Sequence, residues 1–192
     1  MCKTNLQLPH STNTVSLIYC SHTLEHLEES AAVHFLRECF RVMVKSGCLR
    51  LALPYTSEDF DFLKLIHRAV PKESSISRKA TSYAVKHLVG LEIDDKNCDL
   101  ITRKIQEFNY SANSFFEWVK STMPNLCQFD GRHPENHITF WNLDKLQKIG
   151  QEIGFAVVVP TQQNHSLFKP FTNRYVFDTT DPHLSFYVEL IK

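Results

Sequence analysis

The densest group of potentially reactive side chains is the segment Cys20-Ser21-His22-Thr23-Leu24-Glu25-His26. It combines imidazoles, a thiol, hydroxyls and a carboxylate, the groups that proteins use for proton transfer and metal binding. The segment directly follows the apolar run 15–20, and in open α/β sheets ligands bind at the C-terminal ends of strands. If the segment is helical, His22 and His26 share one face. Two interpretations are open: these histidines contact a ligand, or they hydrogen-bond loop backbone and fix the turn.

His22-x-x-Glu25-His26 also fits the H-x-x-E-H pattern of inverted zinc peptidases. Such a site needs two histidines on one face of a long helix, a glutamate as general base and a third ligand, for which Glu107 is a candidate. Here a strand is expected to end at Cys20, immediately before the pattern. A zinc peptidase-like protein is therefore kept only as a lesser alternative, because the motif lacks its structural context.

A second polar group lies in Gly131-Arg132-His133-Pro134-Glu135-Asn136-His137. His133 and His137 are candidates for contact with a substrate. The alternative is a polar loop whose histidines are solvated. Trp141 and Tyr175 could line a pocket, although packing in the core is the default for aromatic side chains.

The elements around the first cluster form a βαβ unit. Residues 15–20 predict a buried strand, and residues 31–44 carry apolar side chains at helical spacing. Lys45-Ser46-Gly47 is expected to form a turn before a second strand at 48–53, which Pro54 ends. Strand, helix and strand at this spacing imply parallel pairing with a right-handed crossover.

The rest of the chain is predicted to be helical and then mixed. Residues 56–130 are expected to form a helical insertion within a single domain that spans residues 1–192. Asn142 is expected to cap a helix that stops at Gly154. A strand at 155–159 follows and is expected to end at Pro160. The alternating pattern at 184–190 predicts a final strand.

Composition narrows the class of protein. Lys+Arg and Asp+Glu balance at 21 each, so the formal net charge is zero and does not indicate binding to nucleic acid. No apolar run approaches the roughly 20 residues of a membrane span, and the N-terminus lacks a secretory signal. The six cysteines contain no C-x-x-C pair, which favours reduced thiols and a cytoplasmic location over a structural zinc site.

Two blocks resemble the class I, Rossmann-like S-adenosylmethionine-dependent methyltransferases. Residues 8–27, with VSLIYCSHTLEHL, are similar to the fourth strand and following loop of that family, and residues 36–54, with LREC-FRV and KSGCLRLALP, continue the match. Residues 137–155 resemble the family's last helix, and FDTTDPHLSFYVE at 177–189 resembles its final strand. The middle of the chain matches neither block.

The resemblance implies the fold, the cofactor and a set of site residues. The fold is α/β, with this chain supplying strands four to seven of a Rossmann-like methyltransferase sheet, flanking helices and a helical insertion. The cofactor is S-adenosylmethionine, the methyl acceptor is undefined, and His22 is the candidate catalytic base. The cofactor-binding candidates are Asn5, Leu8, Cys20, Ser21 and His26, and the substrate-binding candidates are His133 and His137.

The chain departs from the family where the cofactor is normally gripped. Family members use a glycine-rich turn after the first strand and an acidic residue that ends the second. None of the five glycines here has G-x-G spacing, and the match begins just before the fourth strand. We therefore expect an N-terminally truncated methyltransferase domain that binds S-adenosylmethionine poorly by itself. The alternative is a non-catalytic remnant that serves as an interaction module.

The resemblance to the methyltransferase family leads to two structural expectations. The strand at 184–190 should lie antiparallel between those at 48–53 and 155–159, because the family's last strand inserts between its fifth and sixth. The alternative arrangement is an edge hairpin outside the strand at 155–159. The strand at 15–20 should form an exposed sheet edge and promote self-association.

Overall fold

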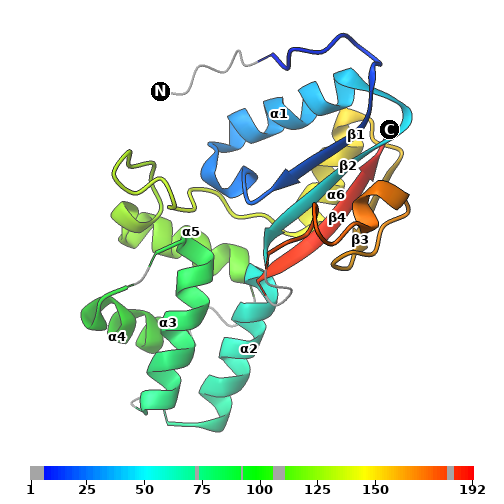
Figure 1. Cartoon of the computed structure of the whole chain (residues 1–192). Helices are drawn as coiled ribbons and strands as arrows, with labels where there is room; N and C mark the ends of the chain where they lie inside the picture. Colours follow the sequence, from blue (N-terminus) through cyan, green and yellow to red (C-terminus); the bar gives the residue numbers. More distant parts are fainter. Residues whose placement is uncertain (1–6, 72–73, 92, 106–110, 181–183) are drawn as a thin grey trace. The chain divides into compact units, whose positions relative to one another are not determined.

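The computed structural model describes residues 7–71, 74–91, 93–105, 111–180 and 184–192 (Figure 1). The chain divides into two compact units, Met1–Pro54 with Trp141–Lys192, and Tyr55–Phe140. Across the described residues, no helix is both long enough and apolar enough to cross a membrane. The expectation of one domain with an insertion at 56–130 stays a prediction.

The first unit is built on a four-stranded mixed sheet with the order β1-β2-β4-β3. β1 (Val15–Ser21) pairs in parallel with β2 (Met43–Pro54), and α1 (Glu29–Val42) makes the crossover between them. The sequence thus correctly predicted an α/β fold that begins with a βαβ unit. Among the described residues, β1 pairs only with β2 and forms one edge of the sheet.

The last strand inserts into the sheet. β4 (Ser185–Ile191) is antiparallel to both of its neighbours, β2 and β3 (Val157–Thr161). Val188 pairs with Leu51 on one side and with Pro160 on the other. The predicted position of this strand is confirmed, and the edge hairpin is excluded. Local pairing alone would favour the hairpin, so contacts distant in sequence determine the order of the strands.

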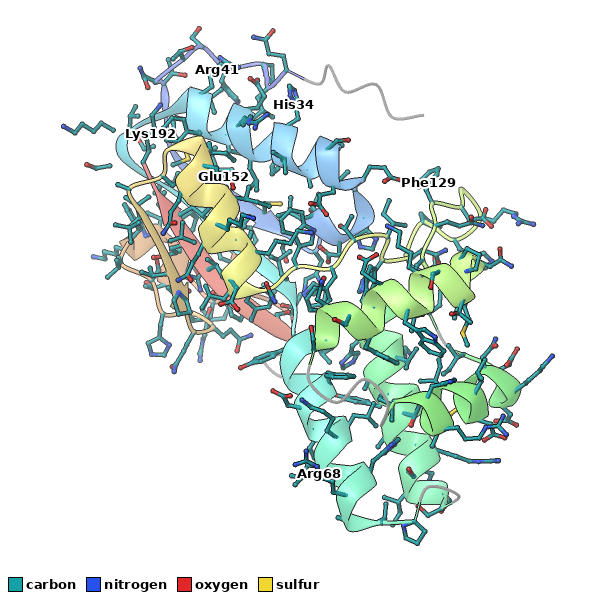
Figure 2. The ribbon with its side chains drawn as sticks, turned by 180° about the vertical axis from the view of Figure 1, so that it is seen from behind. His34, Arg41, Arg68, Phe129, Glu152 and Lys192 are labelled. Atoms are coloured by element: carbon teal, nitrogen blue, oxygen red, sulfur yellow. The ribbon has the colours of Figure 1, made fainter. Side chains whose placement is uncertain are left out.

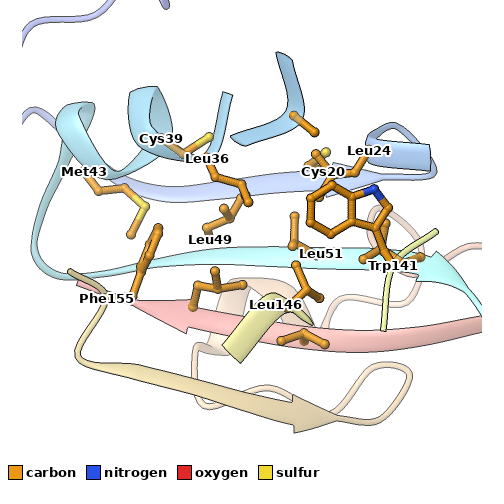
Figure 3. Packing of buried hydrophobic residues seen from close by; sticks show 14 residues of the cluster. Cys20, Leu24, Leu36, Cys39, Met43, Leu49, Leu51, Trp141, Leu146 and Phe155 are labelled. Carbon is orange, nitrogen blue, oxygen red and sulfur yellow. The ribbon is translucent and has the colours of Figure 1, made fainter. Parts of the chain in front are cut away.

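One face of the sheet is covered by α1 and α6 (Leu143–Ile153) (Figure 1). Alternate strand residues point into the core between them, because side chains along a strand alternate between the two faces. Figure 3 shows the resulting packing. Its fully or almost fully buried members include Leu36, Cys39, Leu49, Leu51, Trp141, Leu146 and Phe155. Asn142 caps α6 by accepting a hydrogen bond from the Lys145 N–H, and Gly154 ends it with φ of 112°, as the sequence predicted.

The opposite face is covered by the segment between β3 and β4, which includes a short 3-10 helix, Lys169–Thr172. Tyr19 of β1 makes aromatic contacts with Phe171 and Phe177 of this segment, at centroid separations of 6.2 and 5.0 Å. Arg50 of β2 also points to this face and is fully buried. The backbone groups of this segment need hydrogen-bond partners, because the segment is largely a loop. The strands therefore present some polar side chains on this face.

Two sequence expectations about strand ends are wrong. β2 begins at Met43, so Lys45-Ser46-Gly47 lies inside the strand and is not a turn. Ser46 has φ of 62°, and the β1–β2 register shifts between Val15 and Leu17, which marks an irregularity in a continuous strand. Pro160 lies within β3 and does not end it. This is tolerated because β3 is an edge strand, where a missing N–H need not break a ladder on both sides.

The second unit, Tyr55–Phe140, contains the helices α2 (Thr56–Ala69), α3 (Ser75–Val89), α4 (Asp95–Lys104) and α5 (Ala112–Thr122). The side chains of Ser74, Asp94 and Ser111 cap the last three by accepting a backbone N–H. The unit has its own apolar core, which includes Leu63, Val85, Val89, Ile101, Phe115, Phe116 and Val119. The predicted helical character of this segment is confirmed.

Candidate functional site

His22 directly follows β1, at the C-terminal end of that parallel strand. Its backbone N–H donates to the Ala52 carbonyl at 2.9 Å, which extends the pairing with β2 by one residue. Its φ is 45°, a left-handed conformation that is uncommon for a residue with a side chain. Such a conformation costs on the order of 1 kcal/mol and persists only where surrounding contacts hold it. The contacts of the imidazole ring supply that constraint.

Both ring nitrogens of His22 have partners. Nδ1 lies 3.2 Å from Oε1 of Glu25, and Nε2 lies 2.7 Å from Oγ of Ser185, the first residue of β4. The His22 side chain is 29% exposed, so its ring is only partly covered. The imidazole therefore bridges the turn after β1 and the start of β4, two segments that are 163 residues apart.

The Glu25 carboxylate is buried at the same place. Glu25 lies in a single 3-10 turn, Leu24–His26, and is 2% exposed. No donor in the described part of the chain points in line at either carboxylate oxygen, although the His22 ring is within ion-pair distance. His26 Nε2 is 3.9 Å from the same oxygen. A buried carboxylate is costly unless a partner compensates it. Of the two imidazoles near Glu25 in this unit, His22 is the nearer.

Ser185 continues the chain of contacts away from the carboxylate. Its Oγ is 3.1 Å from Oγ1 of Thr180, and that oxygen is 3.3 Å from the Tyr187 hydroxyl. Ser185 and Tyr187 are buried and Thr180 is half-buried. Four polar side chains thus contact one another in series from Tyr187 to His22, and Glu25 lies at the end of this series.

The predicted cofactor-binding residues occupy different surroundings. Cys20 and Ser21 end β1 and flank His22, and burial raises the pKa of the Cys20 thiol. Leu8 lies beside α1, where its N–H donates to Glu38 Oε2 at 2.9 Å and its carbonyl accepts from Arg41 at 3.2 Å. Arg41 itself lies in the last turn of α1 (Figure 2). Asn5 lies outside the described residues. Their predicted roles in binding a cofactor stay predictions.

The predicted substrate-binding residues belong to the second unit. His133 is exposed, and its Nδ1 lies 3.3 Å from Glu135 Oε1. The backbone N–H of His137 donates to the Val89 carbonyl at 2.9 Å, at the end of α3. The structure thus brings His22, Glu25 and His26 together in the first unit and describes His133 and His137 in the second.

The zinc interpretation does not fit the geometry around His22. The H-x-x-E-H pattern spans a single 3-10 turn and not the long helix that the peptidase arrangement requires. The glutamate contacts His22 directly, and the other ring nitrogen of His22 is within hydrogen-bond distance of Ser185. The third ligand expected for that arrangement, Glu107, lies outside the described residues.

No sequence pattern predicted that Ser185 contacts His22, or that Thr180 and Tyr187 extend this contact. Glu25 was expected only as part of the zinc pattern. The available signal was the polar character of Ser185 in an otherwise apolar strand, but no sequence spacing connects residue 185 with residue 22.

The chain matches no family model, and a search of curated proteins finds no match.

Proposed function

We propose that this chain is the C-terminal part of a class I, Rossmann-like methyltransferase domain that transfers a methyl group from S-adenosylmethionine to an undefined acceptor. The single observation that carries the proposal is the strand order β1-β2-β4-β3 with β4 antiparallel. In the family that the sequence resembles, the last strand inserts between the fifth and sixth strands in the same way. The pairing of β4 with β2 extends over seven residue pairs, from Cys48 to Pro54, so it is not a marginal contact.

The location of the polar cluster supports the proposal. His22, Cys20 and Ser21 lie at the C-terminal end of β1, and ligands of open α/β sheets bind at this end of the strands. His22 is the candidate base, because an imidazole is suited to proton transfer near neutral pH. Leu8, Cys20, Ser21, His26 and Asn5 are the candidates for cofactor contact. His133 and His137 are the candidates for acceptor contact.

The residues of this chain fit only one side of such a cofactor site. The strand end beside His22 is present, but no two glycines have the G-x-G spacing that lets backbone approach the cofactor closely. Methyl transfer would therefore require additional strands that carry the glycine-rich turn and pair with β1. The open side of β1 is where such strands would add.

The test is a fusion of the first three strands and helices of a class I methyltransferase to the N-terminus of this chain, with Asn5 retained. We expect the fusion to bind S-adenosylmethionine with micromolar affinity by calorimetry and to transfer tritiated methyl groups to a panel of small molecules and proteins. The N-terminal half alone and this chain alone are the controls. A folded, monomeric fusion that does not bind S-adenosylmethionine would contradict the proposal.

A second candidate is a non-catalytic interaction module. The observation that favours it is the position of β1, which has one neighbouring strand among the described residues, so its other side can accept a strand from another chain. The same fusion separates the two candidates. An interaction module would give a folded fusion without cofactor binding, whereas a methyltransferase half would give binding.

A further inference from the structure

Hydrogen bonds join the polar side chains from Tyr187 to His22, and the series ends where His22 lies within ion-pair distance of Glu25. An ionised carboxylate can only accept hydrogen bonds, whereas hydroxyls can both donate and accept. Nδ1 of His22 faces the Glu25 carboxylate at 3.2 Å. If that nitrogen carried a lone pair, the lone pair would lie beside the negative carboxylate and be repelled by it, whereas an N–H there is attracted to it. The proton of a neutral His22 ring therefore belongs on Nδ1.

The position of that proton determines the remaining donors. With Nδ1 protonated, Nε2 of His22 is an acceptor, so the Ser185 hydroxyl donates to it at 2.7 Å. The Ser185 oxygen is then free to accept from the Thr180 hydroxyl at 3.1 Å. Thr180 in turn accepts from the Tyr187 hydroxyl at 3.3 Å. Every hydroxyl donates toward the carboxylate, and hydrogen bonds aligned in this way strengthen one another.

We propose that Glu25 is the positioning residue of a directed relay, Thr180–Ser185–His22, which takes a proton from the methyl acceptor. This deepens the proposed function and rests on it for the identity of the acceptor. Because both ring nitrogens of His22 have partners, the acceptor reaches the base through the hydroxyls. Thr180 is the half-buried hydroxyl, and its contact with Tyr187 is long, so an acceptor can replace Tyr187 as the donor.

The transfer balances along the relay. The acceptor O–H or N–H gives its proton to Thr180 and keeps the bonding electron pair for its new bond. Thr180 passes its own proton to Ser185, and Ser185 passes its proton to Nε2 of His22. The ring becomes an imidazolium whose charge lies beside the Glu25 carboxylate. A relay of this kind is needed only for an acceptor that must lose a proton, so the substrate class is a hydroxyl or amine and not a carboxylate.

The first test needs no methyl transfer, and it uses a relay variant only to assign the resonances. The ¹⁵N resonances of the His22 ring are measured in the intact chain at neutral pH and assigned by their loss in His22→Gln. We expect a single tautomer with the proton on Nδ1. A proton on Nε2 would overturn the proposal, because the relay would then run away from the carboxylate.

Variants then separate positioning from simple packing. Glu25→Gln should populate the second tautomer, since an amide can donate to Nδ1 as well as accept from it. The exposed Glu28→Gln is the matched control and should leave the single tautomer unchanged. Thr180→Val should keep the tautomer but shift the Nε2 resonance toward that of an unbonded nitrogen, because the Ser185 donor loses its own donor.

An unchanged tautomer in a folded Glu25→Gln chain would overturn the positioning role, and an unchanged Nε2 resonance in Thr180→Val would overturn the relay. If the fusion described above fails to bind S-adenosylmethionine, the proposed function fails while the tautomer measurement still decides this inference.

Discussion

Replacing Arg50 with methionine should destabilise the first unit strongly, because this guanidinium compensates two buried carboxylates. Arg50 is 0% exposed and donates to the Asp178 carboxylate and, at 2.9 Å, to Oε1 of Glu189. It also donates to Thr161 and to the carbonyls of Gln162 and His165. Burial lowers the pKa of Arg50, but the hydrogen bonds and charges of Asp178 and Glu189 outweigh this and leave it raised.

The magnitude follows from what the substitution leaves behind. Methionine nearly matches the arginine stem, so little packing is lost, but Asp178 and Glu189 remain buried without a cation. Breaking a buried ion pair by removing one partner costs about 3–5 kcal/mol. The total stability of a domain is about 5–15 kcal/mol, so the variant should lose a large fraction of it.

The assay is urea unfolding followed by Trp141 fluorescence in a Trp118→Phe background. The two tryptophans lie in different units, so this background reports the first unit alone. Arg37→Met, at an exposed position of α1, is the matched control and should change the free energy of unfolding by less than about 0.5 kcal/mol.

Adding Asp178→Asn and Glu189→Gln to Arg50→Met should recover part of the loss, because no unpaired charge then remains. A loss of less than about 1 kcal/mol for Arg50→Met alone would refute the reasoning, since it would mean that water or protonation compensates the carboxylates.

Three further predictions concern pH, cofactor and assembly. The Arg41 hydrogen bonds lower the pKa of Glu38 from 4.5 to about 2, so Glu38 stabilises the fold above pH 4.5 and this contribution is lost as the pH falls toward 2. Glu38→Gln should be less stable than wild type at neutral pH by urea unfolding, and a difference that persists at pH 2 would contradict this. Calorimetric titration of the chain alone with S-adenosylmethionine should show no micromolar binding; a clear micromolar isotherm would disprove it. Light scattering at high concentration should show self-association through β1, and Ser16→Lys should reduce it, because a charge on an edge strand opposes pairing; a monomeric wild-type chain would argue against this.

The elements of the first unit could be predicted from local patterns, whereas their exact ends could not. Lys45-Ser46-Gly47 has the composition of a turn, yet the chain continues as β2 because distant backbone pairs with it. The Ser46 N–H donates to the Lys192 carbonyl at 2.8 Å, and the Lys192 N–H donates to the Gly47 carbonyl at 3.1 Å. Pairing with the last residue of the sequence cannot be read from the composition of a three-residue segment.

The sequence predicted only some residues of the candidate site. His22 stood out because it follows a strand, and strand ends collect functional groups. The partners that determine its chemistry are Glu25, which looked like part of a metal motif, and Ser185, which looked like a weak point in an apolar strand. Periodicity identifies the face of an element, but it does not identify which distant side chain meets that face.

The polar residues of β4 have a common explanation. Ser185, Tyr187 and Glu189 alternate with Phe186, Val188 and Leu190, and the apolar set packs against the core under α1 and α6. The polar set faces the loop between β3 and β4, whose backbone and side chains need hydrogen-bond partners. Arg50 lies over the Tyr187 ring at 5.2 Å and pairs with Glu189, while Ser185 contacts His22.

This stripe also fixes the register of the inserted strand. A slip of one residue would turn every side chain of β4 to the other face, placing Glu189 in the apolar core and Val188 beside Arg50. Both the ion pairs of Arg50 and the contact between Ser185 and His22 would be lost together. The arrangement that places Ser185 against His22 is therefore specified by the same residues that hold β4 between β2 and β3, so the geometry of the relay depends directly on the strand order.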